Sequence, residues 1–193
     1  IFSSWTSNIM LGILKEILAV ILFEPKPITK YQKISEKPIA QILLLLVVAL
    51  GFVLPVQGAS FFANYFFFGL GTYLVIYIAA VFFQNWFRFT GINAQLKPLF
   101  VILTLALAMN ILVLPVYLLA SYFDSFVFIY INEVLVSYSL FILIFALAKS
   151  VDSSLIYVLL GTAICSLPVF FALTILHALF IYLGFLPVPI WET

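Results

Sequence analysis

The stretch that decides the fold is Ile42-Leu43-Leu44-Leu45-Leu46-Val47-Val48-Ala49-Leu50, an apolar run without a single polar interruption. Strands of membrane barrels alternate apolar and polar residues over about ten positions, and this run does not alternate. A helix satisfies its own backbone hydrogen bonds inside hydrocarbon. The run therefore predicts a helix that crosses a membrane.

The composition extends this prediction to the whole chain. Of its 193 residues, 66% are hydrophobic and 8% are charged, whereas soluble domains carry about 45–50% apolar and about 25% charged residues. Eight basic and seven acidic residues cannot cover a water-exposed surface. The composition excludes a soluble enzyme, a nucleic-acid binder and a disordered tail, and it predicts an all-α, polytopic transmembrane helical bundle.

Five runs are long enough to span about 30 Å of hydrocarbon, which takes about 20 residues. They cover residues 39–57, 61–83, 99–120, 126–148 and 155–183. Pro38 and Pro98 open the first and third runs, and Pro168 is expected to tilt or kink the fifth. The predicted organisation is a cytosolic or interfacial segment over 1–37, a five-helix domain over 38–185 and a short tail over 186–193.

The basic residues predict the orientation. With five spans, all eight lie on one side: Lys15, Lys26, Lys30, Lys33, Lys37, Arg88, Lys97 and Lys149. The loops on the other side, with the tail, carry only Asp124 and Glu192 as charges. The positive-inside rule then predicts a cytosolic N-terminus and a C-terminus outside the cytosol. Because the first residue is Ile1 rather than methionine, we expect that the chain is trimmed or fragmentary.

Residues 9–23 are apolar but span only about one leaflet. Gly12, Lys15, Glu16 and Ala19 share one helical face, and leucines and isoleucines occupy the opposite face. This pattern predicts an amphipathic helix in the plane of the membrane. A secretory signal is the alternative, but the segment has neither a basic start nor a clear cleavage site.

Among the polar residues within the predicted spans, four are candidates for a functional role: Glu133, His177, Asn110 and Asn64. Polar groups in hydrocarbon are functional candidates because they are costly there. Glu133 either lies about two turns into a helix that starts at Phe126, on a proton or cation path, or it is a solvated residue at the start of a helix near Val134. We favour the second interpretation.

His177 is the only histidine, and one imidazole cannot build a metal site. It either titrates or makes a structural hydrogen bond between helices, the interpretation we favour; Asn64 and Asn110 are expected to tie helices in the same way. The lone cysteine, Cys165, is expected to be a packing residue. HExxH, GxSxG, P-loop and CxxC motifs are all missing from the sequence. We therefore expect no enzymatic activity, no cofactor and no metal.

The cytosolic face supplies the candidate contact residues for partners or lipid. They are Lys26, Lys30, Lys33, Lys37, Trp86, Arg88 and Lys97. Trp86-Phe87-Arg88-Phe89 is typical of an aromatic and cationic anchor at a membrane surface, and the lysines favour anionic lipid headgroups. The expected partners are the lipid bilayer and other membrane proteins, and not nucleic acid.

The order of these features resembles a known family. Leu22-Phe23-Glu24-Pro25-Lys26 leads into five spans, the third ends in a Leu-Pro step, and a polar turn over 150–154 precedes a long fifth span. Residues 22–185 are similar to the Ypt-interacting protein (Yip) domain family, especially its bacterial members. The resemblance implies five spans and a cytosolic N-terminus and, through the bacterial members, location in a bacterial inner membrane. Eukaryotic relatives bind prenylated small GTPases in membrane traffic, but their Asp-Leu-Tyr-Gly-Pro motif is absent here.

Two functions follow as hypotheses. The first is a non-enzymatic scaffold or partner-binding subunit that works through its cytosolic face. The alternative is a small transporter or permease subunit with a polar path formed by Glu133, Asn110 and His177. Convergence of these three residues on a wet cavity favours transport, and a dry, packed interior favours the scaffold.

Overall fold

The computed structural model describes residues 12, 14–53, 58–120 and 125–187. All regular structure within them is helical: α2 (Ile28–Tyr31), α3 (Glu36–Val53), α4 (Phe61–Arg88), α5 (Leu96–Leu107), the 3-10 helix η1 (Ala108–Leu112), α6 (Val113–Ala120), α7 (Ser125–Ser150) and α8 (Leu155–Tyr182). A short helix over residues 14–21 precedes α2. Among the described residues, five helical segments are long and apolar enough to cross a membrane. The predicted all-helical class and five spans are confirmed.

Local chemistry explains where these helices begin. The hydroxyls of Ser60 and Ser154 each accept a hydrogen bond of 3.2 Å from the backbone N–H three residues ahead, which caps α4 and α8. Pro38 and Pro98 lie in the first turns of α3 and α5. The missing N–H of a proline costs nothing there, because first-turn N–H groups have no partner within the helix.

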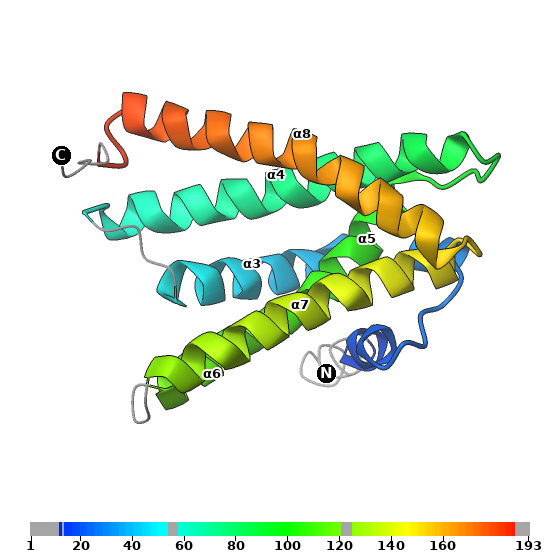
Figure 1. Ribbon diagram of the computed structural model, residues 1–193, viewed down its shortest axis with the longest axis horizontal. Helices are drawn as coiled ribbons and strands as arrows, with labels where there is room; N and C mark the ends of the chain where they lie inside the picture. Colours follow the sequence, from blue (N-terminus) through cyan, green and yellow to red (C-terminus); the bar gives the residue numbers. More distant parts are fainter. Residues whose placement is uncertain (1–11, 13, 54–57, 121–124, 188–193) are drawn as a thin grey trace, which may run out of the picture.

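The bundle is built around α5, the most buried of the spanning segments. Leu99, Ile102 and Leu105 on α5 are completely buried. Figure 1 shows α3, α4, α7 and α8 running along the long axis of the molecule, with α8 packed beside α4. Most apolar side chains of α8 are exposed, as expected of a helix at the lipid-facing edge.

The third span, predicted over 99–120, is confirmed as a segment over Leu96–Leu119, but its helix is interrupted along the way. The chain runs through α5, tightens into η1 and resumes as α6. Pro115 has no N–H, so the carbonyl of Ile111 loses the partner that an α-helix would provide. The turn before the proline therefore adopts 3-10 bonds, a common adjustment beside such a break.

The fourth helix begins earlier than the favoured interpretation of Glu133 required. α7 starts at Ser125, so the helix start expected near Val134 is wrong, although the part of α7 identified as apolar enough to cross a membrane runs from Glu133 to Ser150. The stretch before Glu133 contains Tyr130 and Asn132, but one helix runs through all of it. Glu133 is therefore inside α7, with an exposed side chain.

Opposite ends of the bundle differ in chemistry. Lys26, Lys30, Lys33, Lys37, Arg88, Lys97 and Lys149 lie on segments that meet at one end, and Lys15 lies on the helix docked beside it (Figure 1). We call this end the basic end. A hydrogen bond of 2.8 Å from Gln32 Nε2 to Gln95 Oε1 ties it together. At the other end Leu176, Phe180 and Leu186 form a small apolar cluster. This segregation agrees with the predicted threading.

The contact between α4 and α8 depends on a glycine. The Trp86 ring stacks on Tyr157 with centroids 4.9 Å apart. Trp86 Nε1 donates to the Tyr157 carbonyl at 3.3 Å, and the Tyr157 hydroxyl donates to the Trp86 carbonyl at 2.6 Å. A Cβ on Gly161 would lie 2.8 Å from Trp86 Nε1 and 3.1 Å from Phe83 Cε1. Only glycine therefore leaves room for the indole.

We predict that Gly161→Ala destabilises the protein while Gly69→Ala does not. A Cβ on Gly69 meets only Val47 Cγ1 at 3.7 Å, an ordinary contact. Overpacking at Gly161 should cost about 1–3 kcal/mol, or roughly 3–10 °C in the midpoint of thermal unfolding for a chain of this size. Unfolding of both purified variants in one detergent measures this. Equal midpoints would mean that the indole moves aside freely.

We further predict that the basic end and the opposite end face different compartments. Single cysteines replace Lys33 and Phe185, two exposed residues, in a Cys165→Ala background. An impermeant maleimide should label each cysteine from one side only, and from opposite sides, because five crossings separate them. Labelling of both from the same side would refute the five-span topology.

Candidate functional site

The helix over residues 14–21 lies across the bundle rather than along it. Figure 1 shows it nearly end-on, beside α7. Leu14, Leu18 and Leu22 form an exposed stripe, with 57%, 47% and 65% of their surface accessible. Val20 is completely buried against the bundle, and Ile17 packs against the same core. The helix therefore has one apolar face on the protein and a second, open one.

The predicted polar face is only partly open. Gly12 and Lys15 are exposed, whereas Glu16 and Ala19 are half-buried. Glu16 turns toward the protein because its carboxylate forms an ion pair with Lys26. The pair lets an acidic residue approach the core, since an unpaired carboxylate there would be costly.

Phe23 ends this helix in a conformation that is unusual for its residue type. Its φ is +60°, in the left-handed region, and the Glu24 N–H donates to the Ala19 carbonyl at 2.7 Å across it. Glycine normally fills this position, and a residue with a Cβ costs about 1–2 kcal/mol there. The phenyl ring lies 5.9, 5.5 and 4.9 Å, between centroids, from the rings of Tyr138, Phe141 and Phe145. Edge-to-face contacts of this kind offset the cost.

Two side chains of α7 satisfy backbone carbonyls at the same helix end. The Tyr138 hydroxyl donates to the Ile21 carbonyl at 3.2 Å, and Lys149 Nζ donates to the Phe23 carbonyl at 2.9 Å. The last carbonyls of a helix lack partners within it, and a cation is favourable beside them. α7 thus holds the C-terminus of the docked helix by ring contacts and by hydrogen bonds.

Tyr31 anchors the segment between the docked helix and α3. Its side chain is buried, and its hydroxyl accepts a hydrogen bond of 3.0 Å from the Lys26 N–H. Burial raises the pKa of Tyr31, the Lys26 N–H lowers it, and the Glu16 carboxylate raises it further. The net shift is upward, so the phenol remains neutral. A cavity of about 250 Å³ adjoins it, lined among others by Lys30 and Lys33.

The other predicted contact residues lie in three different settings. Lys30, Lys33, Lys37 and Arg88 are exposed to the outside of the basic end. Trp86 is half-buried, and its ring packs against α8 rather than facing outward. Lys97 pairs with Glu36, at 3.4 Å between Nζ and Oε1.

The intramembrane candidates behave differently from one another. Asn64 is buried, and its Nδ2 donates to the Gly51 carbonyl on α3 at 2.8 Å, which confirms the predicted tie between helices. The Oδ1 atom of Asn110 is buried without a partner among the described residues. Asn110 lines a cavity of about 330 Å³ whose other lining residues are apolar except for Ser139. His177 is exposed, and its ring makes an edge-to-face contact with the Phe67 ring, with the ring centroids 5.9 Å apart.

These polar residues do not converge on one path. The half of α7 that carries Glu133 and the half of α8 that carries His177 lie on opposite sides of the bundle in Figure 1, with α3 and α4 between them. Asn110 belongs to η1, which contacts α3, α5, α6 and α7. The described part of the chain therefore shows no shared cavity for the three residues.

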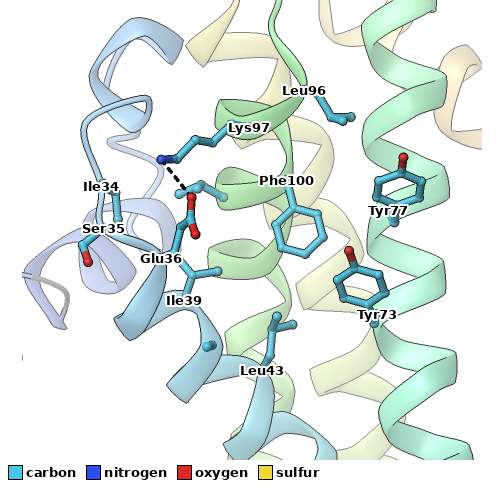
Figure 2. Close-up of a pocket in the computed structure, with 12 residues that line it drawn as sticks. Ile34, Ser35, Glu36, Ile39, Leu43, Tyr73, Tyr77, Leu96, Lys97 and Phe100 are labelled. Atoms are coloured by element: carbon cyan, nitrogen blue, oxygen red, sulfur yellow. Dashed lines mark ion pairs between the residues drawn. The ribbon is translucent and has the colours of Figure 1, made fainter.

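A larger cleft opens at the basic end between α3 and α4, over α5. Its volume is about 460 Å³. Figure 2 shows the Glu36–Lys97 pair at one end, Phe100 in the middle, and the rings of Tyr73 and Tyr77 facing Ile39 and Leu43 across it. Sequence reasoning found Lys97 alone among the lining residues. The i, i+4 spacing of Tyr73 and Tyr77 is the local signal that was available for the aromatic wall.

Comparison with protein-family models, with curated proteins and with solved structures finds no match to this chain. The fold and composition define a class: a helical membrane protein whose described residues form five segments long and apolar enough to span a membrane. The docked N-terminal helix and the cleft at the basic end are the two places where the described residues form a candidate site.

We predict that Phe23→Ala loosens the docked helix. The variant loses three ring contacts, so hydrogen exchange in residues 14–22 should accelerate roughly tenfold. Phe89→Ala is the matched control, because the Phe89 ring lies at the same end and is 84% exposed. Exchange by mass spectrometry measures both. Unchanged protection in Phe23→Ala would show that the ring contacts do not hold the helix.

Proposed function

We propose that this chain is a non-enzymatic integral membrane protein of Yip-like architecture that acts as a scaffold or partner-binding subunit. The observation that carries the proposal is the helix over 14–21, docked across the bundle by Phe23 and α7, with its leucine stripe left open. A helix in this position lies in the interface and inserts the leucines into hydrocarbon. The cytosolic side of the basic end is then the working surface.

The charge of the basic end supports an acidic partner surface. Lys30, Lys33 and Lys37 are exposed around the segment that joins the docked helix to α3, and Arg88 is exposed at the end of α4. Glu16 and Glu36 are already paired with Lys26 and Lys97. Exposed cations of this kind steer an acidic protein or an anionic membrane to the surface. A small GTPase as partner rests on the family resemblance alone.

The transporter alternative has less support. Its three polar residues lie on separate sides of the bundle, and the cavity at Asn110 has apolar walls apart from Ser139. Transport sites normally form where polar groups meet near the middle of the membrane.

We predict that the double variant Lys30→Glu, Lys33→Glu lowers several-fold the amount of partner protein that co-purifies with the chain. Proximity labelling and quantitative co-purification from native membranes compare this variant with the unaltered chain. Reversing two cations at a binding surface costs of the order of 1 kcal/mol or more in affinity. His177→Ala and Glu133→Gln are the controls, because they lie away from the basic end and should leave recovery unchanged.

The same variants test the alternative. Under the scaffold proposal, Glu133→Gln leaves solute flux in reconstituted vesicles unchanged. If Glu133→Gln alters flux or its pH dependence, while Lys30→Glu with Lys33→Glu leaves partner recovery intact, the scaffold proposal is wrong and the transporter replaces it.

A further inference from the structure

The cleft between α3 and α4 has charged groups at one end and apolar walls along the rest of its length. Ile39 and Leu43 form one wall, Tyr73 and Tyr77 form the other, and Phe100 lies between them (Figure 2). Its charged groups, Glu36 and Lys97, meet at one end only. A volume of about 460 Å³ lies within the roughly 300–1,000 Å³ of small-molecule sites.

The aromatic wall is open rather than packed. Tyr73 and Tyr77 stack with centroids 6.0 Å apart and remain 50% and 42% exposed. The Tyr73 ring also contacts Phe100 at 5.7 Å. Figure 2 shows both hydroxyls on the side of the rings nearer the charged end. Exposed rings of this kind present apolar faces to a guest and hydroxyls to its polar end.

The ion pair between Glu36 and Lys97 can be replaced by contacts with a ligand. Glu36 and Lys97 are separated by 3.4 Å, and their side chains are 87% and 48% exposed. An exposed ion pair contributes little to stability, so replacing it by contacts with a ligand is inexpensive. The carboxylate has free acceptor positions, and the ammonium has three donors. Together they match a ligand that carries one cation and one anion close together.

We infer that the cleft binds a phospholipid with a primary ammonium headgroup, of the phosphatidylethanolamine type. The phosphate lies at Lys97, the ammonium lies at Glu36, and one acyl chain follows the apolar walls past Phe100 toward Leu43. A quaternary ammonium gives Glu36 no N–H donor. An anionic headgroup without an ammonium leaves Glu36 facing like charge. The inference concerns lipid and not the partner protein, so either one can fail without the other.

The experiment uses the purified full chain in detergent, stripped of lipid, and dioleoyl phosphatidylethanolamine, phosphatidylcholine and phosphatidylglycerol as probes. Native mass spectrometry measures the affinity for each lipid. The unaltered chain should bind phosphatidylethanolamine several-fold more tightly than either of the others, because only that headgroup satisfies both charges.

Four variants locate the site. Lys97→Gln removes the phosphate contact, and Ala40→Phe fills the cleft from an exposed lining position; each should weaken phosphatidylethanolamine binding about tenfold. Glu36→Gln should abolish the preference over phosphatidylglycerol. Lys37→Gln is the control, since it removes the same charge from an exposed neighbour outside the cleft, and it should leave binding unchanged.

Several outcomes would overturn the inference. One is a preference of the unaltered chain for phosphatidylglycerol, which would indicate capture of anionic lipid by the basic end. Another is equal loss in Lys37→Gln and Lys97→Gln, which would remove the cleft from the interaction. A third is a lipid-free dimer that Ala40→Phe dissociates, which would place a second copy of the chain in the cleft. Because Lys97 lies at the surface, Lys97→Gln should not disturb folding, and it still tests the cleft if Ala40→Phe folds poorly.

Discussion

Exclusion of charge from hydrocarbon is the constraint on which the rest of the structure depends. A lysine or arginine at the centre of a spanning helix costs about 2.5–3.5 kcal/mol on insertion scales. All eight basic residues lie on segments at or beside one end. The helices must therefore associate without ion pairs along their length. They do so by close packing at Gly161 and by a few interhelical hydrogen bonds such as the one from Asn64 to Gly51.

Because of this segregation, different kinds of side-chain contact hold the segments together at the two ends of the bundle. At the basic end, the segments are joined by polar contacts such as Gln32 with Gln95 and Lys97 with Glu36. At the opposite end, Leu176, Phe180 and Leu186 pack in an apolar cluster, and the Leu186 N–H donates to the Phe180 carbonyl at 3.2 Å. Polar contacts have directional geometry. The basic end combines such contacts with exposed charged side chains, and both the docked helix and the cleft lie there.

Periodicity and run length predicted the five spans, because each span depends on its own local sequence. The bounds differ most at the end of the second span, predicted at Phe83 and found at Arg88, since aromatic and amide residues extend a helix into the interface. The start of the fourth span was predicted at Phe126 and found at Ser125. The break at η1 was not located, because it depends on backbone bonding around Pro115. Local sequence patterns could not predict the cleft. Glu36 and Tyr73 are far apart in the chain, and only the packing of α3, α4 and α5 brings them together.

The docked helix shows how such a long-range contact determines a local conformation. Nothing in Leu22-Phe23-Glu24 favours a left-handed residue, and the ring contacts with α7 select it at Phe23. The segment that follows connects this helix to the cleft. Tyr31 is buried in the core, and Ile34 lines both the cavity beside Glu16 and the cleft. The docked helix and the cleft are therefore joined in the chain by one short segment, which is anchored in the core at Tyr31 and contributes Ile34 to the wall of the cleft.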